Sequence, residues 1–178
     1  MSDAQGFGIG APAPRLELPD TSGALTALPE PGKAPATVVV WTCNHCPYAL
    51  AWHDRLQAVA REYRPRGARF FSVNSNDAER YPADSLAAMR ERAGEFEGPY
   101  LHDESQRAAR AWGAQVTPDV FVLDSDLRLI YRGAPDADHE DPVQDAAWVR
   151  VPLDDLVSGR RPESSRTDSV GCSIKWKA

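Results

Sequence analysis

The stretch Thr37-Val38-Val39-Val40-Trp41-Thr42-Cys43-Asn44-His45-Cys46-Pro47-Tyr48 decides the fold. It opens with a β-branched run that has no polar face, which is typical of a central strand buried on both sides. From Pro47 onward the apolar residues recur at intervals of three and four, which predicts an amphipathic helix. The apolar stripe of that helix consists of Ala49, Trp52, Leu56, Val59 and Tyr63. A Cys-x-x-Cys pair therefore stands where a buried strand runs into a helix.

The position of the pair at a helix start favours thiol chemistry. Unpaired N–H groups and the positive end of the helix dipole stabilise a thiolate. We therefore expect Cys43 to have a lowered pKa and to be the nucleophile, with Cys46 one turn along as its buried partner. His45 lies between them and, when protonated, would stabilise the Cys43 thiolate. Such stabilisation favours the reduced form, and we expect a reduction potential of about −150 to −240 mV.

Two other interpretations of the cysteine pair are weaker. Two buried structural cysteines would have no reason to stand at a strand–helix junction. A zinc site needs four ligands, but the chain has no second Cys-x-x-Cys, and His53 would have to fold back towards the pair. We therefore expect no metal at Cys43 and Cys46.

Composition and charge exclude several classes of function. The 178 residues fit one domain, with 42% hydrophobic residues and a net charge of −6 from 20 basic and 26 acidic side chains. This balance predicts neither a nucleic-acid groove nor a surface for anionic membranes. No apolar run approaches the roughly 20 residues of a membrane helix. Residues 1–5 carry no basic segment leading into an apolar one, so we expect a cytoplasmic protein.

Strand and helix patterns alternate along the chain. This order predicts an α/β fold with a parallel core and antiparallel edge strands. The predicted strands are Arg15–Leu18, Thr37–Trp41, Arg69–Asn74, Tyr100–His102, Asp119–Leu123 and Leu127–Arg132, the last two forming a hairpin. The predicted helices run from Pro47 to before Pro65, from 84 to 93, from Asp103 with Gln106 in a capping box to Gly113, and from 143 to 157 with a break before Pro152.

The chain divides into three predicted parts. Residues 1–14, rich in Gly, Ala and Pro, should form a loosely ordered lead, and residues 15–159 the folded domain. Residues 160–178 form a tail whose polar part, 160–167, should be a linker. Val170, Ile174 and Trp176 then return as an apolar cluster, which a free tail would not need, so we expect the tail to dock on the domain.

Four segments carry a resemblance to a known family. They are the motif Cys43-Asn44-His45-Cys46, the opening from Gly10 to Gly23, the triplet Thr117-Pro118-Asp119 and the ending Gly171-Cys172-Ser173-Ile174-Lys175-Trp176. With them the chain resembles the thioredoxin superfamily, in its branch of peroxiredoxin-like and TlpA-like redoxins (the AhpC/TSA group). The resemblance implies a thioredoxin-like fold, with a central mixed sheet flanked by helices, an N-terminal β extension and a C-terminal tail.

The resemblance also implies an activity and a set of roles. The activity is thiol–disulfide oxidoreduction by the Cys43–Cys46 couple, without a cofactor. A cellular thiol serves as reductant, a protein or small-molecule disulfide or dithiol as substrate, and the protein is a monomer or a homodimer. Pro118 would follow a cis peptide bond beside the cysteines, and the backbone of Thr117 would bind an extended substrate. Trp41 and Tyr48 flank the motif and are expected at its rim.

This sequence departs from the family patterns at two places. Thr37 stands where thioredoxins have a buried acid, so no residue is assigned to handle the proton of Cys46. Ala36 and Val40 replace the Pro and Thr/Ser of the peroxiredoxin motif. Two alternatives stay open beside the oxidoreductase. One is a thiol peroxidase with Cys43 peroxidatic and Cys46 or Cys172 resolving, and the other is a copper-binding redoxin using Cys43, Cys46 and a histidine.

Three further features receive predictions of their own. Cys172 is a resolving thiol, a redox-sensitive clasp that links to Cys43, or an inert tail cysteine. The acidic segment from Asp136 to Asp141 lacks calcium-loop spacing and is expected to be a solvated loop. Three tryptophans at helical positions, Trp52, Trp112 and Trp148, are expected in the core.

Overall fold

A computed structural model describes residues 6–178, so the first five residues of the predicted lead lie outside the described residues. The strands are β1 (Glu17–Pro19), β2 (Leu25–Ala27), β3 (Thr37–Trp41), β4 (Arg69–Asn74), β5 (Tyr100–His102), β6 (Val116–Thr117), β7 (Asp119–Leu123), β8 (Leu129–Gly133), β9 (Ser165–Arg166) and β10 (Cys172–Ser173). The α-helices are α1 (Pro47–Tyr63), α2 (Leu86–Arg92), α3 (Arg107–Trp112) and α4 (Ala147–Val157).

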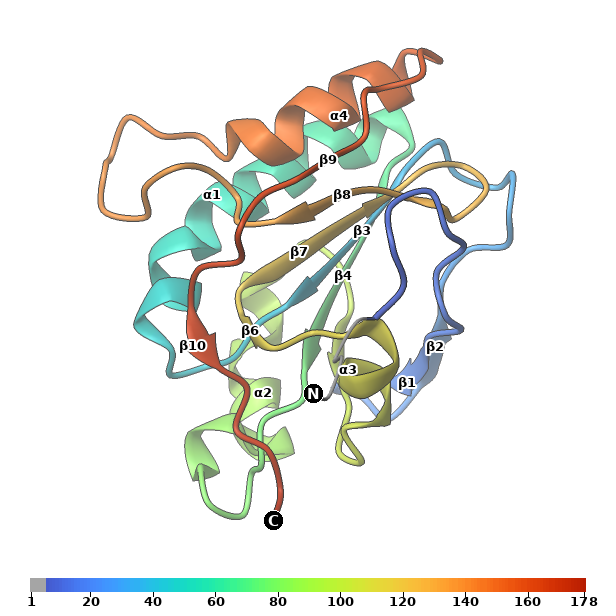
Figure 1. The fold of residues 1–178 in the computed structure, drawn as a ribbon. Coiled ribbons are helices and arrows are strands. Elements are labelled where there is room, and N and C mark those ends of the chain that lie inside the picture. The colour runs from blue at the N-terminus through green and yellow to red at the C-terminus, as the bar shows by residue number, and fades with distance from the viewer. Residues whose placement is uncertain (1–5) are drawn as a thin grey trace.

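Six strands form the central mixed sheet, in the order β5-β4-β3-β7-β8-β9 (Figure 1). The strands β3, β4 and β5 are parallel, whereas β7 pairs antiparallel with both β3 and β8. Two small sheets lie apart from it, β1 with β2 and β10 with β6. The predicted α/β thioredoxin-like fold is confirmed.

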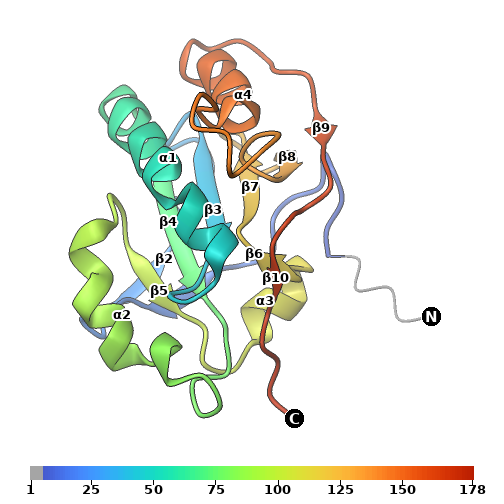
Figure 2. The same ribbon diagram turned by 90° about the vertical axis from the view of Figure 1, so that its left-hand side faces the viewer.

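Strand β3 lies in the middle of the sheet between β4 and β7, and all five of its residues are buried. Val38 and Val40 face the side of the sheet that α1 and α4 cover. Val39 and Trp41 face the opposite side, in a cluster that includes residues of α3 and of the tail. Figure 2 shows α1 and α4 together on one side of the sheet, with α3 on the other. Strand β3 is therefore covered by an apolar layer on each face of the sheet, and the chain passes from it into α1.

Helix α1 follows its predicted limits. It begins at Pro47, whose missing N–H costs nothing in the first turn. It ends at Tyr63, where a 3-10 turn over Arg64–Arg66 leads to Gly67 with a φ of 100°. Trp52 and Val59 of the predicted stripe are almost fully buried. Because this helix is long and well packed, it holds the cysteine pair at its N-terminus in a fixed position.

Two other helices differ from their predicted form. Helix α3 begins at Arg107, and Gln106 forms no capping box because it has a φ of 62° and its side chain turns to the tail. Helix α4 begins at Ala147 and continues through Pro152 without a break. Trp148 is 37% exposed and is therefore not a core residue, in contrast to Trp52 and Trp112.

Residues 6–14 pack on the domain, so the expectation of a loose lead is wrong for the described part. The N–H of Gly10 donates to the carbonyl of Leu129 at 2.8 Å. The ring of Phe7 contacts Trp112 edge-on, with centroids 5.1 Å apart. The lead is held because it covers aromatic side chains that would otherwise face water.

The acidic segment is also more ordered than predicted. Asp136 is 1% exposed and accepts hydrogen bonds from Trp52 Nε1 at 2.8 Å and from the Arg55 guanidinium. It also accepts one from the N–H of Ala146, just before α4. This carboxylate is therefore a buried anchor between α1 and α4 rather than part of a solvated loop.

The tail does not begin with a linker. Residues Ser165 and Arg166 form β9, which extends the central sheet by pairing parallel with β8. The chain then crosses to β10, which pairs with β6 (Figure 1). The polar composition of residues 160–167 predicted a linker. It is equally compatible with an edge strand such as β9, whose two residues are exposed. Within residues 6–178, none of the helices combines the length and apolar character that crossing a membrane requires.

Candidate functional site

The cysteine pair lies at the carboxyl end of β3 and the start of α1. Cys46 is the residue before the helix, and its N–H donates to the Sγ of Cys43 at 3.3 Å. Both side chains are covered, Cys43 at 1% and Cys46 at 0% exposure. The expectation that only Cys46 would be buried is therefore wrong. The sulfur of Cys43 lies close to Thr117 of the cis-proline loop and to Asp84 of the loop before α2, and both help to bury it.

The loop between β6 and β7 forms one wall of the site. The Thr117–Pro118 peptide bond is cis, as predicted. The hydroxyl of Thr117 lies 3.4 Å from the Sγ of Cys43, and the thiol of Cys46 donates to the carbonyl of Thr117 at 3.2 Å. Thr117 thus touches both sulfurs, one through its side chain and one through its backbone.

Two residues implied as substrate contacts, Thr117 and Trp41, are engaged by other parts of the chain. The backbone of Thr117 is paired with Cys172 in the β6–β10 ladder, so its strand edge is occupied by the chain's own tail. Trp41 is fully buried below the motif, and its Nε1 donates to Ser75 Oγ at 3.0 Å. Trp41 cannot shape the rim of the site, because its side chain belongs to the core. Tyr48 is half-buried and packs against the cysteine cluster.

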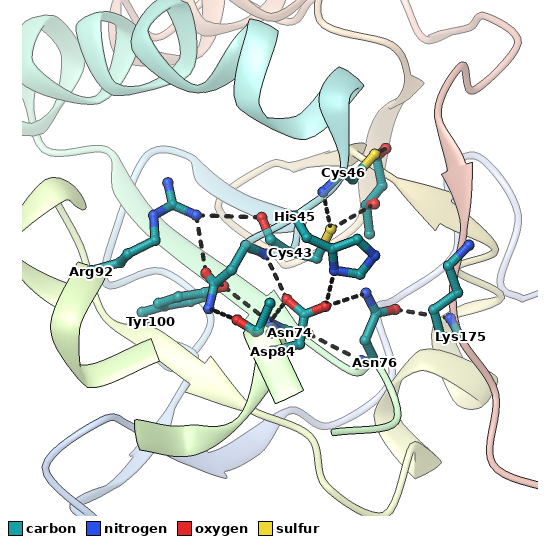
Figure 3. Close-up of polar contacts among 12 residues, drawn as sticks. Cys43, His45, Cys46, Asn74, Asn76, Asp84, Arg92, Tyr100 and Lys175 are labelled. Carbon is teal, nitrogen blue, oxygen red and sulfur yellow. Dashed lines mark hydrogen bonds and ion pairs between the residues drawn. The ribbon is translucent and has the colours of Figure 1, made fainter. Parts of the chain in front are cut away.

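Asp84 is a site residue that the sequence did not reveal. It ends a 3-10 turn, Pro82–Asp84, in the loop before α2, and it is fully buried. Its carboxylate contacts the Nδ1 of His45 and accepts the N–H of Asn44 at 2.6 Å. Figure 3 shows Asp84 directly below the motif, between His45 and two asparagines. The buried carboxylate of Asp84 therefore holds the motif loop in place through its contacts with His45 and Asn44.

Further polar side chains hold Asp84 in place. Asn74 and Asn76 each donate to one of its oxygens at 3.0 Å. Asn74 also donates to the hydroxyl of Tyr100, which in turn donates to Asn44. Burial above all raises the pKa of Tyr100, which keeps it a neutral donor. The network satisfies both oxygens of Asp84 and fixes Asn44 within the motif.

His45 is the partly exposed member of the motif. Its ring stacks on Tyr81, with centroids 5.6 Å apart and planes within 3°. One of its ring nitrogens, the Sγ of Cys43 and an oxygen of Asp84 all lie within 4.8 Å of one another. His45 is thus in contact with the Asp84 carboxylate and close to the Cys43 sulfur.

The surroundings of the two sulfurs distribute one negative charge between them. The hydrogen bond shared with Cys46 raises the pKa of Cys43 first, and burial and the charge of Asp84 raise it further. The same hydrogen bond lowers the pKa of Cys46 to about 4, against the effect of burial. The expected low pKa of Cys43 is therefore not found in the dithiol, where the hydrogen bond between the two sulfurs couples their ionisation and raises the pKa of Cys43.

Cys43, His45 and Asp84 also form a group, within residues 6–178, whose possible ligand atoms lie close enough together for a metal ion. An ion would have to displace existing contacts, because both oxygens of Asp84 are already bonded to His45, Asn44 and the two asparagines. The copper-binding alternative named Cys46 as a ligand, and its sulfur is not part of this group. The geometry fits proton handling beside a thiol better than a metal centre.

Cys172, the third cysteine, lies on β10 above the pair. It is half-buried, and it packs against the cluster formed by Cys43, Cys46 and Ala49. Its thiol is within hydrogen-bonding reach of Cys46. With all three thiols free, the sulfur that Cys172 contacts is that of Cys46.

Comparisons with known proteins identify the family of the chain. The family model described as Redoxin matches residues 9–148. The chain is similar to the crystal structure of an uncharacterized conserved protein from Geobacillus kaustophilus, with 38% identity, a TM-score of 0.90 and coverage of 97% of this chain and 94% of that one. A hypothetical protein from Sinorhizobium meliloti 1021 shares 32% identity at a TM-score of 0.89, covering 98% and 97%.

More distant structures share the fold alone. Peroxidoxin BcpB from Mycobacterium tuberculosis has 17% identity and a TM-score of 0.65, with 87% of this chain and 99% of that chain covered. A putative thiol:disulfide interchange protein DsbE from Chlorobium tepidum has 18% identity and a TM-score of 0.60, with 71% and 85% covered. The search of curated proteins finds no match.

Proposed function

The chain belongs to the Redoxin family, and from that premise we propose that it is a thiol–disulfide oxidoreductase that cycles Cys43 and Cys46 between dithiol and disulfide. One observation carries the proposal. The two thiols share a hydrogen bond at the start of α1, where the N–H of Cys46 donates to Cys43. A pair that shares one proton at a helix N-terminus loses that proton readily and closes to a disulfide without moving the backbone far.

The first step is attack by Cys43 on a substrate disulfide. The proton of Cys43 passes along the shared hydrogen bond to the Cys46 thiolate. The resulting Cys43 thiolate accepts hydrogen bonds from the N–H of Cys46 and the hydroxyl of Thr117, and the new Cys46 thiol donates to the Thr117 carbonyl. Cys43 then forms a mixed disulfide with the substrate, and the first substrate thiolate leaves and takes up a proton.

The second step is resolution by Cys46. Cys46 loses its proton and attacks the Sγ of Cys43, so the Cys43–Cys46 bond forms and the second substrate thiolate leaves. The sequence assigned no residue to this proton. The structure favours the Asp84–His45 pair beside Cys43 for it, because His45 is partly exposed and can exchange protons with water. The reverse direction oxidises a substrate dithiol.

A thiol peroxidase is the second candidate. The observation that favours it is the Thr117 hydroxyl at 3.4 Å from the Cys43 sulfur, since a hydroxyl donor there could orient a peroxide. This threonine comes from the cis-proline loop and not from the position at Val40 that the peroxiredoxin pattern uses. Cys43 would be oxidised to a sulfenic acid, and Cys46 would resolve it with release of water.

The proposed chemistry suits a reducing compartment such as the cytoplasm. It uses only the sulfurs of Cys43 and Cys46 and exchangeable protons, so no cofactor enters the steps. A cellular thiol would supply electrons, and a protein or small-molecule disulfide would take them. Because β10 occupies the edge of β6, an extended peptide would have to displace the tail, and this favours a small disulfide while the tail is docked.

Side-by-side assays of insulin reduction and peroxide consumption test the two candidates, with Cys43→Ser as the control. The oxidoreductase predicts reduction of insulin or of a small disulfide such as oxidised glutathione, and loss of that activity in Cys43→Ser. Peroxide consumption without disulfide reduction would favour the peroxidase. Absence of both activities in the wild-type protein would reject the proposal.

A further inference from the structure

The third cysteine is built into the site by the tail. Cys172 pairs with Thr117 in the antiparallel β6–β10 ladder, and Thr117 touches both other sulfurs. The thiol of Cys172 lies within hydrogen-bonding reach of Cys46, and the backbone amide of Tyr48, in the first turn of α1, also faces it. Three sulfurs therefore surround one helix start, with Cys46 in the middle.

The tail is seated there closely. A Cβ at Gly171 would lie 2.1 Å from the carbonyl oxygen of Thr117, so only glycine lets the chain approach this near. Beyond β10, the N–H of Ile174 donates to the Gln115 carbonyl at 2.8 Å. The N–H of Lys175 donates to Asn76 at 2.9 Å. These contacts fix Cys172 over Cys46 rather than leaving it on a free end.

The three thiols differ in exposure. Cys43 and Cys46 are covered, whereas Cys172 is partly exposed. A disulfide between Cys43 and Cys46 would therefore be shielded from an external thiol, and attack on a disulfide depends on access to a sulfur. The exposed thiol is the one in contact with the buried pair.

We propose that Cys172 is a third redox-active thiol, which takes over the disulfide from the buried pair through Cys46. The Cys172 thiolate attacks the Sγ of Cys46 in the Cys43–Cys46 disulfide. The Cys46–Cys172 bond forms, the Cys43–Cys46 bond breaks, and Cys43 leaves as a thiolate that takes up a proton. This exchange needs no oxidant or reductant. It rests on the proposed function, because it begins from the Cys43–Cys46 disulfide.

A second step returns the protein to its reduced form. An external dithiol attacks the exposed sulfur of Cys172, and Cys46 leaves as a thiolate. The second thiol of the reductant then displaces Cys172, so the reductant is oxidised to its disulfide and all three cysteines are reduced. The tail thus carries the oxidising equivalent from a covered site to the surface.

Ionisation of Cys172 is linked to the state of the pair. In the dithiol form burial raises the pKa of Cys172, and the contact with the charged Cys46 raises it further. Formation of the Cys43–Cys46 disulfide removes the charge of Cys46. Cys172 therefore becomes easier to ionise when there is a disulfide for it to attack.

Disulfide mapping of the full chain tests the proposed pairing. The wild type, Cys43→Ser and Cys46→Ser are each oxidised with one equivalent of diamide, and the disulfides are mapped by mass spectrometry. We expect an internal Cys46–Cys172 disulfide in Cys43→Ser and a smaller yield of Cys43–Cys172 in Cys46→Ser. Absence of Cys46–Cys172 in Cys43→Ser, or a greater yield of Cys43–Cys172, overturns the proposal.

A glycine variant tests whether the seating of the tail sets the pairing. Gly171→Ala keeps all three thiols but forces β10 away from Thr117, whereas an added Cβ at Gly94 meets nothing within 4 Å. In the Cys43→Ser background we expect Gly171→Ala to lose most of the Cys46–Cys172 product and Gly94→Ala to keep it. Equal yields in both would show that a loose tail forms the bond by chance, and would overturn the proposal.

The kinetic test separates this proposal from the proposed function. Re-reduction of the oxidised protein by dithiothreitol should be about tenfold slower in Cys172→Ser than in the wild type and in the control Ser173→Ala, since the variant lacks the most exposed of the three sulfurs. An unchanged rate rejects the relay even if insulin reduction persists. If the wild type forms no Cys43–Cys46 disulfide, the proposed function fails instead.

Discussion

The β3–α1 junction and the C-terminal tail meet at the same three sulfurs, but the two regions are held in place by different interactions. The junction stands on a strand with five buried residues and on a helix whose apolar stripe is covered. The tail makes a two-residue ladder with β6, and beyond it the side chains of Asn76 and Gln106 bind its backbone. One region is fixed by apolar packing and the other mainly by a few hydrogen bonds.

Because of this difference, the junction should govern the thiol reaction, and the tail should govern which molecules reach the cysteines. Loss of the junction would unfold the centre of the sheet. Release of the tail costs a few polar contacts, the burial of Ile174 and the packing of Trp176 on the core and on Arg110. Each hydrogen bond contributes about 1 kcal/mol net. We therefore expect variants in the junction to change the reaction itself and variants in the tail to change what reaches it.

The largest effect is expected in the junction, from Cys46→Ser. This variant keeps the attacking thiol of Cys43 but cannot resolve the mixed disulfide, so turnover should stop after one attack. Insulin reduction should fall to the level without enzyme, and mass spectrometry should show substrate attached to Cys43. Persistent turnover would mean that Cys172 or a second substrate thiol resolves Cys43 instead.

The next effect is expected in the tail, from Gln106→Met. The buried amide of Gln106 donates to the carbonyls of Ser75 and Lys175 and accepts the N–H of Lys177. Methionine keeps the volume and removes all three bonds, which should cost about 2 kcal/mol of unfolding free energy. Trypsin should then cut faster after Lys175.

Urea unfolding and timed proteolysis measure both effects, with Gln144→Met as the control. Within residues 6–178, the side chain of Gln144 hydrogen-bonds to Asp141, three residues away in the loop before α4 and not in the tail. If the two variants are cut at the same rate, the amide of Gln106 does not hold the tail. Insulin reduction by the Gln106 variant should not fall, since the junction is intact.

The same contrast explains what the sequence could predict. The buried run of β3, the stripe of α1 and the Cys-x-x-Cys between them are local patterns, and each is enough to place its residues. The cis bond at Pro118 followed from family resemblance and is confirmed. Residues 160–167 have the polar composition of a linker, and nothing in it shows that Ser165 and Arg166 pair with β8.

Asp84 could not be predicted for a related reason. The sequence places it at a helix start, where a carboxylate is common, and the helix cap is in fact Ser85. Its role depends on a loop folding back under the motif, with Asn74 and Asn76 bonded to its two oxygens. The burial of Cys43 and the raised pKa of its thiol depend in part on the same long-range contacts, which no local pattern predicts.

A smaller effect is expected from Asp84→Asn, which changes the charge beneath the junction. The carboxylate of Asp84 is one cause of the raised pKa of Cys43, after the hydrogen bond with Cys46 and burial. Removing the negative charge should therefore lower the pKa of Cys43 and speed its alkylation at neutral pH. Mass spectrometry of iodoacetamide labelling across pH measures this at Cys43 alone.

The matched control is Asp54→Asn, which removes an exposed carboxylate from α1. It should leave the labelling of Cys43 unchanged. His45→Ala should act in the opposite direction to Asp84→Asn, because the charge of Asp84 would lose its counterpart beside Cys43. Slower labelling in Asp84→Asn would show that the hydrogen bonds of Asp84, rather than its charge, govern Cys43.

The smallest effect is expected on the pKa of His102 on β5, which depends on whether the end of the tail is docked. Burial is the largest influence on this imidazole and lowers its pKa, and the positive charge of Lys177 on the tail lowers it further. Lys177→Gln removes that charge, so the pKa of His102 should rise, and Gln106→Met should raise it as well by releasing the tail. NMR titration of the histidine ring protons measures both variants in the full chain, with His139 as an internal reference on the far loop before α4. A pKa of His102 that stays fixed in both variants would mean that Lys177 does not lie near β5 in solution, and that the end of the tail is free beyond β10.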